Sequence, residues 1–226
     1  MNSNRSFEIS ILFDNKCFKE GFLTGFGFSA LIYNSYTQNY SLFDTGGDGR
    51  VLLHNLQQFD VETDIIKNVI ISHSHFDHSG GLSHVVAQNP EVKIFIPKAN
   101  LKSFQRKYPQ QNIVGVSKPH EIETNMISSG QIGSSIKEQS LYLKKERDFF
   151  IIVGCTHPGL ENFIMKARDM GKVKGVVGGF HGFRKYSYLE GIDIIGACHC
   201  TSHIEAIKKR FPNYYKKICV GDRILF

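Results

Sequence analysis

The chain has 226 residues, of which 41% are hydrophobic, and a formal net charge of +6. That length suits one α/β domain over residues 1–226, and the lack of an 18-residue apolar run excludes a membrane-spanning helix. The first residues lack the pattern of a signal peptide, so we expect a cytoplasmic protein. The positive charge favours a small anionic or phosphorylated partner, and homo-oligomer formation stays open.

Apolar and alternating runs predict strands, in chain order, at residues 7–13 (an outer strand), 28–33, 40–43, 67–71, 91–97, 141–143, 149–153, 173–177, 192–195, 218–220 and 224–225. Helical spacing predicts helices at about 50–59, 82–88 and 98–107, from 160 to a stop at Gly171, and from a Thr201 or Ser202 cap to about 210. We expect a loop over the site or a hairpin at 17–27, and irregular chain with one or two short strands at 110–135.

The five cysteines show no spacing typical of a disulfide framework. An odd number of cysteines in a cytoplasmic chain indicates free thiols. We therefore expect thiols at Cys17, Cys155, Cys198, Cys200 and Cys219.

The segment from Ser72 to Gly81 carries four metal-capable side chains within six residues, directly after an apolar strand. Imidazole and carboxylate are the ligands that zinc and similar divalent ions prefer. His73 and His75 are two residues apart, so on an extended segment they face the same side and can share one ion. Asp77 and His78 follow the turn and can face a second ion. Asp77 is also assigned a catalytic role.

Further strand ends lead into loops with ionisable groups, and such loops hold catalytic groups rigidly. A tetrahedral ion needs more than two protein ligands, and His157 and His199 are the best candidates to complete the two sets. Asp44 is expected to accept a hydrogen bond from a ligand histidine. His181 is assigned a catalytic role, contacting substrate or acting as an acid. No role is assigned to the remaining histidines, His54, His84, His120 and His203.

The motifs Leu-Phe-Asp-Thr-Gly at 42–46 and Ser-His-Ser-His-Phe-Asp-His-Ser-Gly-Gly-Leu at 72–82, with a later single histidine, resemble the metallo-β-lactamase superfamily. The resemblance implies an α/β (α+β) chain folded as a four-layer αβ/βα sandwich, with a two-metal site at the sheet edges. The expected cofactors are therefore two divalent ions, zinc first, with manganese or iron as alternatives.

Shorter motifs resemble one branch of that superfamily, the branch of 7,8-dihydropterin-6-yl-methyl-4-(β-D-ribofuranosyl)aminobenzene-5′-phosphate synthase and related metal-dependent hydrolases. They lie at residues 13–15, 27–29, 138–141, 154–159, 178–181 and 198–201. The chain departs from the branch pattern at Gly182 and Ser202. In the wider superfamily a Gly-Asp supplies a bridging carboxylate, whereas here Gly154-Cys155 stands at such a strand end. Either no carboxylate bridges the ions, or Cys155 is an alternative ligand.

The resemblance implies an enzyme, a metal-dependent hydrolase that uses a metal-bound hydroxide at a dinuclear site. The expected substrate is a small phosphorylated or pterin-related molecule. The alternatives are a phosphodiesterase or nuclease of the same fold, a non-hydrolytic di-metal oxidoreductase, and a non-catalytic metal-binding module. Nuclease relatives carry an extra arm or domain for which 226 residues leave little room, and di-iron oxidoreductases usually carry a carboxylate where His75 stands.

Overall fold

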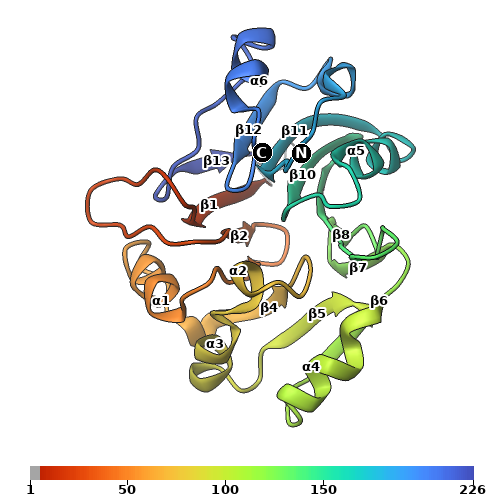
Figure 1. Cartoon of the computed structure of the whole chain (residues 1–226). Coiled ribbons are helices and arrows are strands. Elements are labelled where there is room, and N and C mark those ends of the chain that lie inside the picture. Colours follow the sequence, from red (N-terminus) through yellow and green to blue (C-terminus); the bar gives the residue numbers. More distant parts are fainter. Residues whose placement is uncertain (1–5) are drawn as a thin grey trace.

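Two facing β-sheets with helices on both outer sides make up the computed structural model, which describes residues 6–226 (Figure 1). Within these residues the first sheet has seven strands, in the order β13-β1-β2-β3-β4-β5-β6, and the second has six, in the order β12-β11-β10-β9-β8-β7. The strands of the first sheet are β1 Phe7–Phe13, β2 Ser29–Asn34, β3 Asn39–Phe43, β4 Ile66–Ile70, β5 Lys93–Pro97, β6 Ile113–Val116 and β13 Arg223–Leu225. Those of the second are β7 His120–Glu123, β8 Met126–Ser128, β9 Leu141–Lys145, β10 Asp148–Val153, β11 Lys172–Gly179 and β12 Ile194–Cys198.

The helices divide between the two outer faces according to the apolar side chains that they bury. They are α1 Gly49–Gln57, α2 Phe76–Ser79, α3 Leu82–Gln88, α4 Leu101–Lys107, α5 Leu160–Arg168 and α6 Ile204–Arg210, with short 3-10 helices at Thr63–Ile65, Lys98–Asn100 and Tyr186–Leu189. Leu52 of α1, Leu82 of α3 and Phe104 of α4 pack on the first sheet. Ile164 of α5 and Ile207 of α6 pack on the second.

A third apolar cluster lies between the sheets and draws on both of them. Phe28 and Phe43 of the first sheet are completely buried there with Phe150 and Ile152 of the second. Burying one such side chain contributes about 1.5–3 kcal/mol. Helix, sheet, sheet and helix therefore form four layers, and the predicted αβ/βα sandwich is confirmed.

Parallel pairing brings the functional loops to a common edge of each sheet. β3 runs parallel to β4, and β10, β11 and β12 run parallel to one another. Their carboxyl ends consequently lie side by side, and the loops after them carry Asp44, the 72–78 segment, His157, His181 and His199.

Several local predictions are wrong. β1 is not an outer strand, because β13 pairs with its free edge. Residues 110–135 contain three strands, whereas 218–220 form only an isolated bridge from Val220 to Phe18. Helix α6 begins after His203, because the Thr201 hydroxyl donates to the Cys198 carbonyl and accepts from the Phe180 N–H instead of capping the helix. For residues 17–27, by contrast, the structure shows the loop, one of the two predicted alternatives.

Candidate metal centre

The segment 72–78 changes from non-helical to helical conformation at residue 75. This change separates the side chains before residue 75 from those after it. Residues 72–75 continue from β4 without helical structure, whereas Asp77 and His78 lie in the single-turn helix α2. His73 and His78 are completely buried, but His75 is exposed. The backbone of Gly27 passes directly over this turn at φ +145°, and a β-carbon there would lie 2.2 Å from the Asp77 carbonyl oxygen, so only glycine fits.

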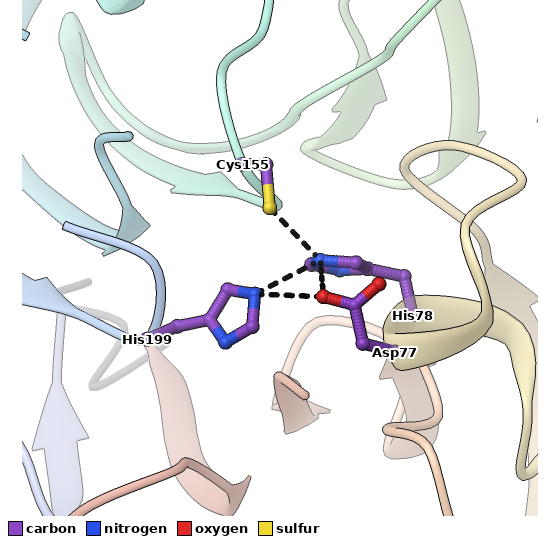
Figure 2. A group of neighbouring side chains, drawn as sticks. All are labelled: Asp77, His78, Cys155 and His199. Atoms are coloured by element: carbon purple, nitrogen blue, oxygen red, sulfur yellow. Dashed lines mark hydrogen bonds and ion pairs between the residues drawn. The ribbon is translucent and has the colours of Figure 1, made fainter. Parts of the chain in front are cut away.

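Two groups of potential ligands adjoin one another among residues 6–226. In each group, one candidate ligand atom per residue lies within 4.8 Å of all the others. One consists of Asp77, His78, Cys155 and His199 (Figure 2). We call it the cysteine set. The His78 Nε2 atom lies 3.1 Å from Cys155 Sγ and 3.2 Å from His199 Nε2, and Asp77 Oδ2 lies 3.2 Å from His199 Nε2.

The other group, which we call the histidine set, consists of His73, His75 and His157. His73 Nε2 lies 3.1 Å from His75 Nδ1, and the ring of His157 lies 4.7 Å from that of His73 between centroids. The ring centroids of His73 and His78 are 4.3 Å apart, so the two sets are in direct contact through these two rings. The structure thus brings together the residues that the sequence grouped as neighbours. That they bind metal stays a prediction.

Asp44 organises the buried side of both sets. It is completely buried, and its Oδ2 atom accepts hydrogen bonds from His78 Nδ1 at 2.7 Å and from the Ser72 hydroxyl at 2.7 Å. The Ser72 oxygen in turn accepts from His73 Nδ1 at 2.9 Å. This network assigns one ring proton of His73 and one of His78 to Nδ1, so that Nε2 of each ring is the atom that would bind a cation.

Two further residues hold ligand histidines in the same way, and the sequence reasoning gave them no role. The buried Glu138 accepts from His157 Nδ1 at 3.0 Å and from the N–H groups of residues 155, 156 and 157. Asn15 Oδ1 lies 3.0 Å from His199 Nδ1 and also accepts from the Gly27 N–H, which fixes its amide orientation. Both lie in motifs quoted for the resemblance, but nothing in their spacing indicates these contacts.

The charges in the site suit cation binding. Burial lowers the pKa of His73 to about 2, so its imidazole is neutral. Burial opposes a charge on His78, but the Asp44 and Asp77 carboxylates outweigh it and raise the pKa of His78 to about 10. Partial burial raises the pKa of Asp77, yet hydrogen bonds from His199 and His78 outweigh it and hold that pKa well below its usual value. A bound cation would replace the His78 proton as partner of Asp77.

Cys155 stands where the superfamily pattern implies a carboxylate. Its contact with Cys200 and its burial raise the pKa of the Cys155 thiol, so without a cation it stays protonated. A coordinated cation deprotonates a thiol. Imidazole, carboxylate and thiolate together are a donor set that fits a divalent ion such as zinc.

His181 lies at the mouth of the site. Its ring is 5.2 Å from that of His157, its side chain is exposed, and its backbone is held at φ 44°, a costly conformation for a residue other than glycine. A hollow of about 390 Å³ opens beside it, flanked by Arg184 and Lys185. The exposed imidazole can therefore reach a molecule in this hollow.

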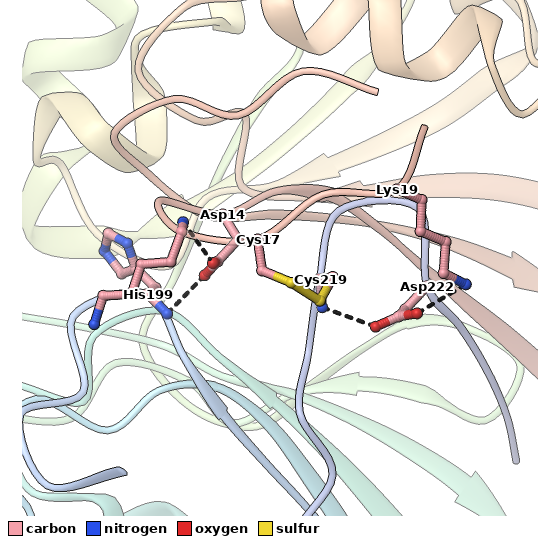
Figure 3. Close-up of a disulfide and its surroundings, with 7 residues drawn as sticks. Asp14, Cys17, Lys19, His199, Cys219 and Asp222 are labelled. Carbon is pink, nitrogen blue, oxygen red and sulfur yellow. Dashed lines mark hydrogen bonds and ion pairs between the residues drawn. A yellow bond between two sulfur atoms is a disulfide. The ribbon is translucent and has the colours of Figure 1, made fainter. Parts of the chain in front are cut away.

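The expectation of five free thiols is wrong for two of them. Cys17 and Cys219 form a disulfide across a sequence separation of 202 residues (Figure 3). The pairing of β1 with β13 brings these segments together, which sequence spacing alone does not reveal. Cys155, Cys198 and Cys200 are free.

The facing sheets and the ligand loops at their edges define a protein of the metallo-β-lactamase fold. The solved structure of Tm1679, a metal-dependent hydrolase of the β-lactamase superfamily, matches with a TM-score of 0.80 and 24% identity, over 96% of this chain and 98% of that one. Within residues 6–226, no helix is long and apolar enough to cross a membrane.

Sequence comparisons support the same branch as the motifs. Residues 21–107 match the family described as anti-Pycsar protein Apyc1. Two Methanocaldococcus jannaschii proteins are similar: an uncharacterized protein, 27% identical over 76% of this chain and 78% of its own length, and 7,8-dihydropterin-6-methyl-4-(beta-D-ribofuranosyl)-aminobenzene-5'-phosphate synthase, 23% identical over 82% and 84%. The metallo-β-lactamase fold that the resemblance implies is confirmed, and the second relative is similar to the dihydropterin synthase branch.

Proposed function

We propose that this chain is a metal-dependent hydrolase that acts on a small phosphorylated or otherwise anionic molecule at a dinuclear site. The observation that carries the proposal is the pair of adjoining ligand sets, with ring protons directed outwards to Asp44, Ser72, Glu138 and Asn15. A solvated histidine turn has no reason to fix four rings in this way.

The histidine set would hold one ion, and Asp77, His78 and His199, with Cys155, would hold the other. When bound, two such ions lower the pKa of a water molecule and stabilise negative charge on a substrate oxygen. Asp77, whose side chain is 13% exposed, and the exposed His181 would then be the groups that orient water or move a proton at the reacting group. The buried Asp44 and Glu138 keep the ligand rings in place during the reaction.

The surroundings favour an anionic substrate. Arg184 and Lys185 border the hollow beside His157 and His181, where Lys185 forms an ion pair with Glu161 and Arg184 donates to His203. A second hollow of about 730 Å³ borders His199 and is lined by Lys16, Lys208 and Lys217 and by Asp14 and Glu205. The net charge of +6 and the relative named as the synthase of a dihydropterin 5'-phosphate compound also support a phosphorylated, pterin-related substrate.

The test combines metal analysis with a panel of phosphate monoesters, phosphodiesters and carboxylic esters. The purified protein should contain about two divalent ions per chain, as expected for a dinuclear site. His73→Ala and His157→Ala should each lower metal content and turnover, whereas His120→Ala, an exposed histidine outside the site, should change neither. Turnover by metal-free protein would refute the proposal. Two bound irons with a redox-active absorption would favour the oxidoreductase instead, and full metal loading without turnover would favour a binding module.

A further inference from the structure

His199 is the only member of either ligand set, within residues 6–226, that is held by the loop after β1. Asp14 Oδ1 accepts a hydrogen bond from the His199 backbone N–H at 2.7 Å (Figure 3). Asn15 Oδ1 lies 3.0 Å from His199 Nδ1. His199 itself adopts φ 49°, which persists in a residue other than glycine only where the surroundings enforce it. The position of its ring therefore depends on the loop that follows β1.

After the buried Asp14, the rest of this loop, residues 15–26, has few apolar contacts, chiefly those of the half-buried Phe22, whose ring lies 5.0 Å from that of Phe59 between centroids. None of the described residues 15–26 is buried, and Phe18, Leu23 and Phe26 are more than 40% exposed. At its far end, Asn55 accepts from the Leu23 N–H and donates to the Leu23 carbonyl. Apolar burial therefore contributes little to the stability of this loop. Hydrogen bonds and covalent bonds must then keep Asn15 in contact with His199.

The C-terminal segment supplies those bonds next to Asn15. Cys17, two residues after Asn15, is joined to Cys219 by the disulfide. Val220 donates to the Cys17 carbonyl and accepts from the Lys19 N–H. The Lys19–Asp222 ion pair, at 2.8 Å, is largely exposed and adds little. The disulfide is the one covalent bond in this group, and it lies at the point closest to His199's partners.

We propose that the Cys17–Cys219 disulfide acts as a positioning device for His199, so that its reduction weakens metal binding by the cysteine set and leaves the histidine set unchanged. This inference rests on the proposed function, because it concerns the second ion of the same site. Disulfides are reduced in cytosolic compartments and persist in oxidising ones. Occupancy of the second metal position therefore follows the redox state of the protein's surroundings.

The reductive step requires an external reductant. With a water-soluble phosphine, the S–S bond breaks, the phosphorus is oxidised to phosphine oxide with an oxygen from water, and the two water protons go to the two thiolates. Two free thiols result. The Asn15 and Asp14 contacts with His199 then depend on hydrogen bonds alone, and loss of such outer contacts typically lowers metal affinity 10–100-fold.

The experiment isolates each set and measures its zinc affinity by competition with a chromophoric chelator. His157→Ala leaves the cysteine set intact, whereas His199→Ala leaves the histidine set intact. Each is measured with the disulfide formed, after phosphine treatment and desalting, and in the Cys17→Ser/Cys219→Ser background. In His157→Ala protein, loss of the disulfide should weaken zinc binding about 10–100-fold. In His199→Ala protein it should have no effect. Asn15→Ala should weaken binding with the disulfide intact, and Asn15→Asp, which keeps the acceptor, should restore it.

Each outcome decides the matter. Equal zinc affinity of His157→Ala protein with and without the disulfide would overturn the inference and leave the proposed function standing. Equal weakening in both variants would also overturn it, because the disulfide would then act on the whole fold. Failure of disulfide-bonded wild-type protein to bind zinc, manganese or iron would overturn the proposed function and this inference with it. If the double serine variant does not fold, the phosphine-treated protein gives the same comparison.

Discussion

Replacing Asp44 by asparagine tests whether the buried carboxylate sets the ring protons of the ligand histidines. Asp44 accepts three hydrogen bonds, from the Ser72 N–H at 2.6 Å, the Ser72 hydroxyl at 2.7 Å and His78 Nδ1 at 2.7 Å. Asparagine has nearly the same shape and tolerates the φ of 57° at this position, so the backbone is not disturbed. It offers one oxygen, however, and an NH₂ group in place of the other.

Either orientation of the new amide leaves a conflict. If its oxygen faces the Ser72 N–H, its NH₂ group faces His78 Nδ1–H, and His78 must shift its proton to Nε2, where it blocks the cation. If the amide is turned round, the NH₂ group faces the Ser72 N–H at 2.6 Å. Losing a hydrogen bond to a charged group and leaving a buried donor unpaired should together lower the free energy of unfolding by about 2–5 kcal/mol. Metal affinity at the cysteine set should fall about 10–100-fold.

Two measurements check this reasoning. Urea unfolding of chelator-treated protein gives the free energy of unfolding, and zinc competition in the His157→Ala background gives the affinity of the cysteine set. Asp193→Asn is the matched control, because Asp193 also accepts a hydrogen bond, from Lys174, but lies on the surface. It should change stability by less than about 0.5 kcal/mol. An Asp44→Asn protein with wild-type stability and zinc affinity would show that Asp44 does not determine the ring protons.

Three other substitutions test separate parts of the site. Burial raises the pKa of Glu138, but its hydrogen bond from His157 and the neighbouring charges and N–H groups outweigh this and hold it at about 2, below the ordinary 4.5. The ionised Glu138 therefore contributes about 3 kcal/mol to the free energy of unfolding above pH 4.5, and this contribution is lost as the pH falls through 2. In metal-free protein, Glu138→Gln should make the free energy of unfolding decline less steeply as the pH falls. An unchanged decline would contradict this reasoning. His181→Gly relieves the positive φ and removes an exposed side chain, so unfolding free energy should stay equal or rise by about 1 kcal/mol while turnover on the ester panel falls about 10²–10⁴-fold. Full turnover would exclude a catalytic role for His181. Cys155→Asp replaces a soft sulfur ligand by a hard oxygen ligand. After dialysis against both metals, this variant should bind a higher ratio of manganese to zinc than the wild-type protein, with Cys155→Ser as the control. An unchanged ratio would show that Cys155 is not a ligand.

Local sequence patterns predict most elements of this fold because each depends on short-range spacing. The helix Leu82–Gln88 was predicted with its observed bounds, and β10 starts within one residue of its prediction. The helix after Cys200 ends at the predicted residue but starts one or two residues later than predicted, because Thr201 uses its hydroxyl for tertiary contacts with Phe180 and Cys198. Such competition depends on the folded neighbourhood and cannot be read from a capping pattern.

The candidate site was predictable where chemistry was concentrated in one segment, and not where it came from remote single residues. His73, His75, Asp77 and His78 occupy one loop, so their residue types and spacing indicated a metal site directly. Asn15 reaches His199 across 184 residues, and Cys17 reaches Cys219 across 202. An asparagine or a cysteine in a glycine-rich loop carries no local signal of either contact.

The two ligand sets also couple metal binding to the packing of the two sheets. The histidine set takes His73 and His75 from the first sheet's loops and His157 from the second's, and the cysteine set likewise joins Asp77 and His78 to side chains that follow β10 and β12. A cation in either position would therefore fasten the edges of the two sheets together. A ligand that binds only the folded state stabilises it by about 2.7 kcal/mol at a free concentration 100 times its dissociation constant. An ion bound there would compensate the buried histidines and carboxylates for the cost that burial imposes on them in the folded chain. Stability and metal binding would then be two measures of one interaction, which urea unfolding and zinc competition of the Asp44→Asn protein test together.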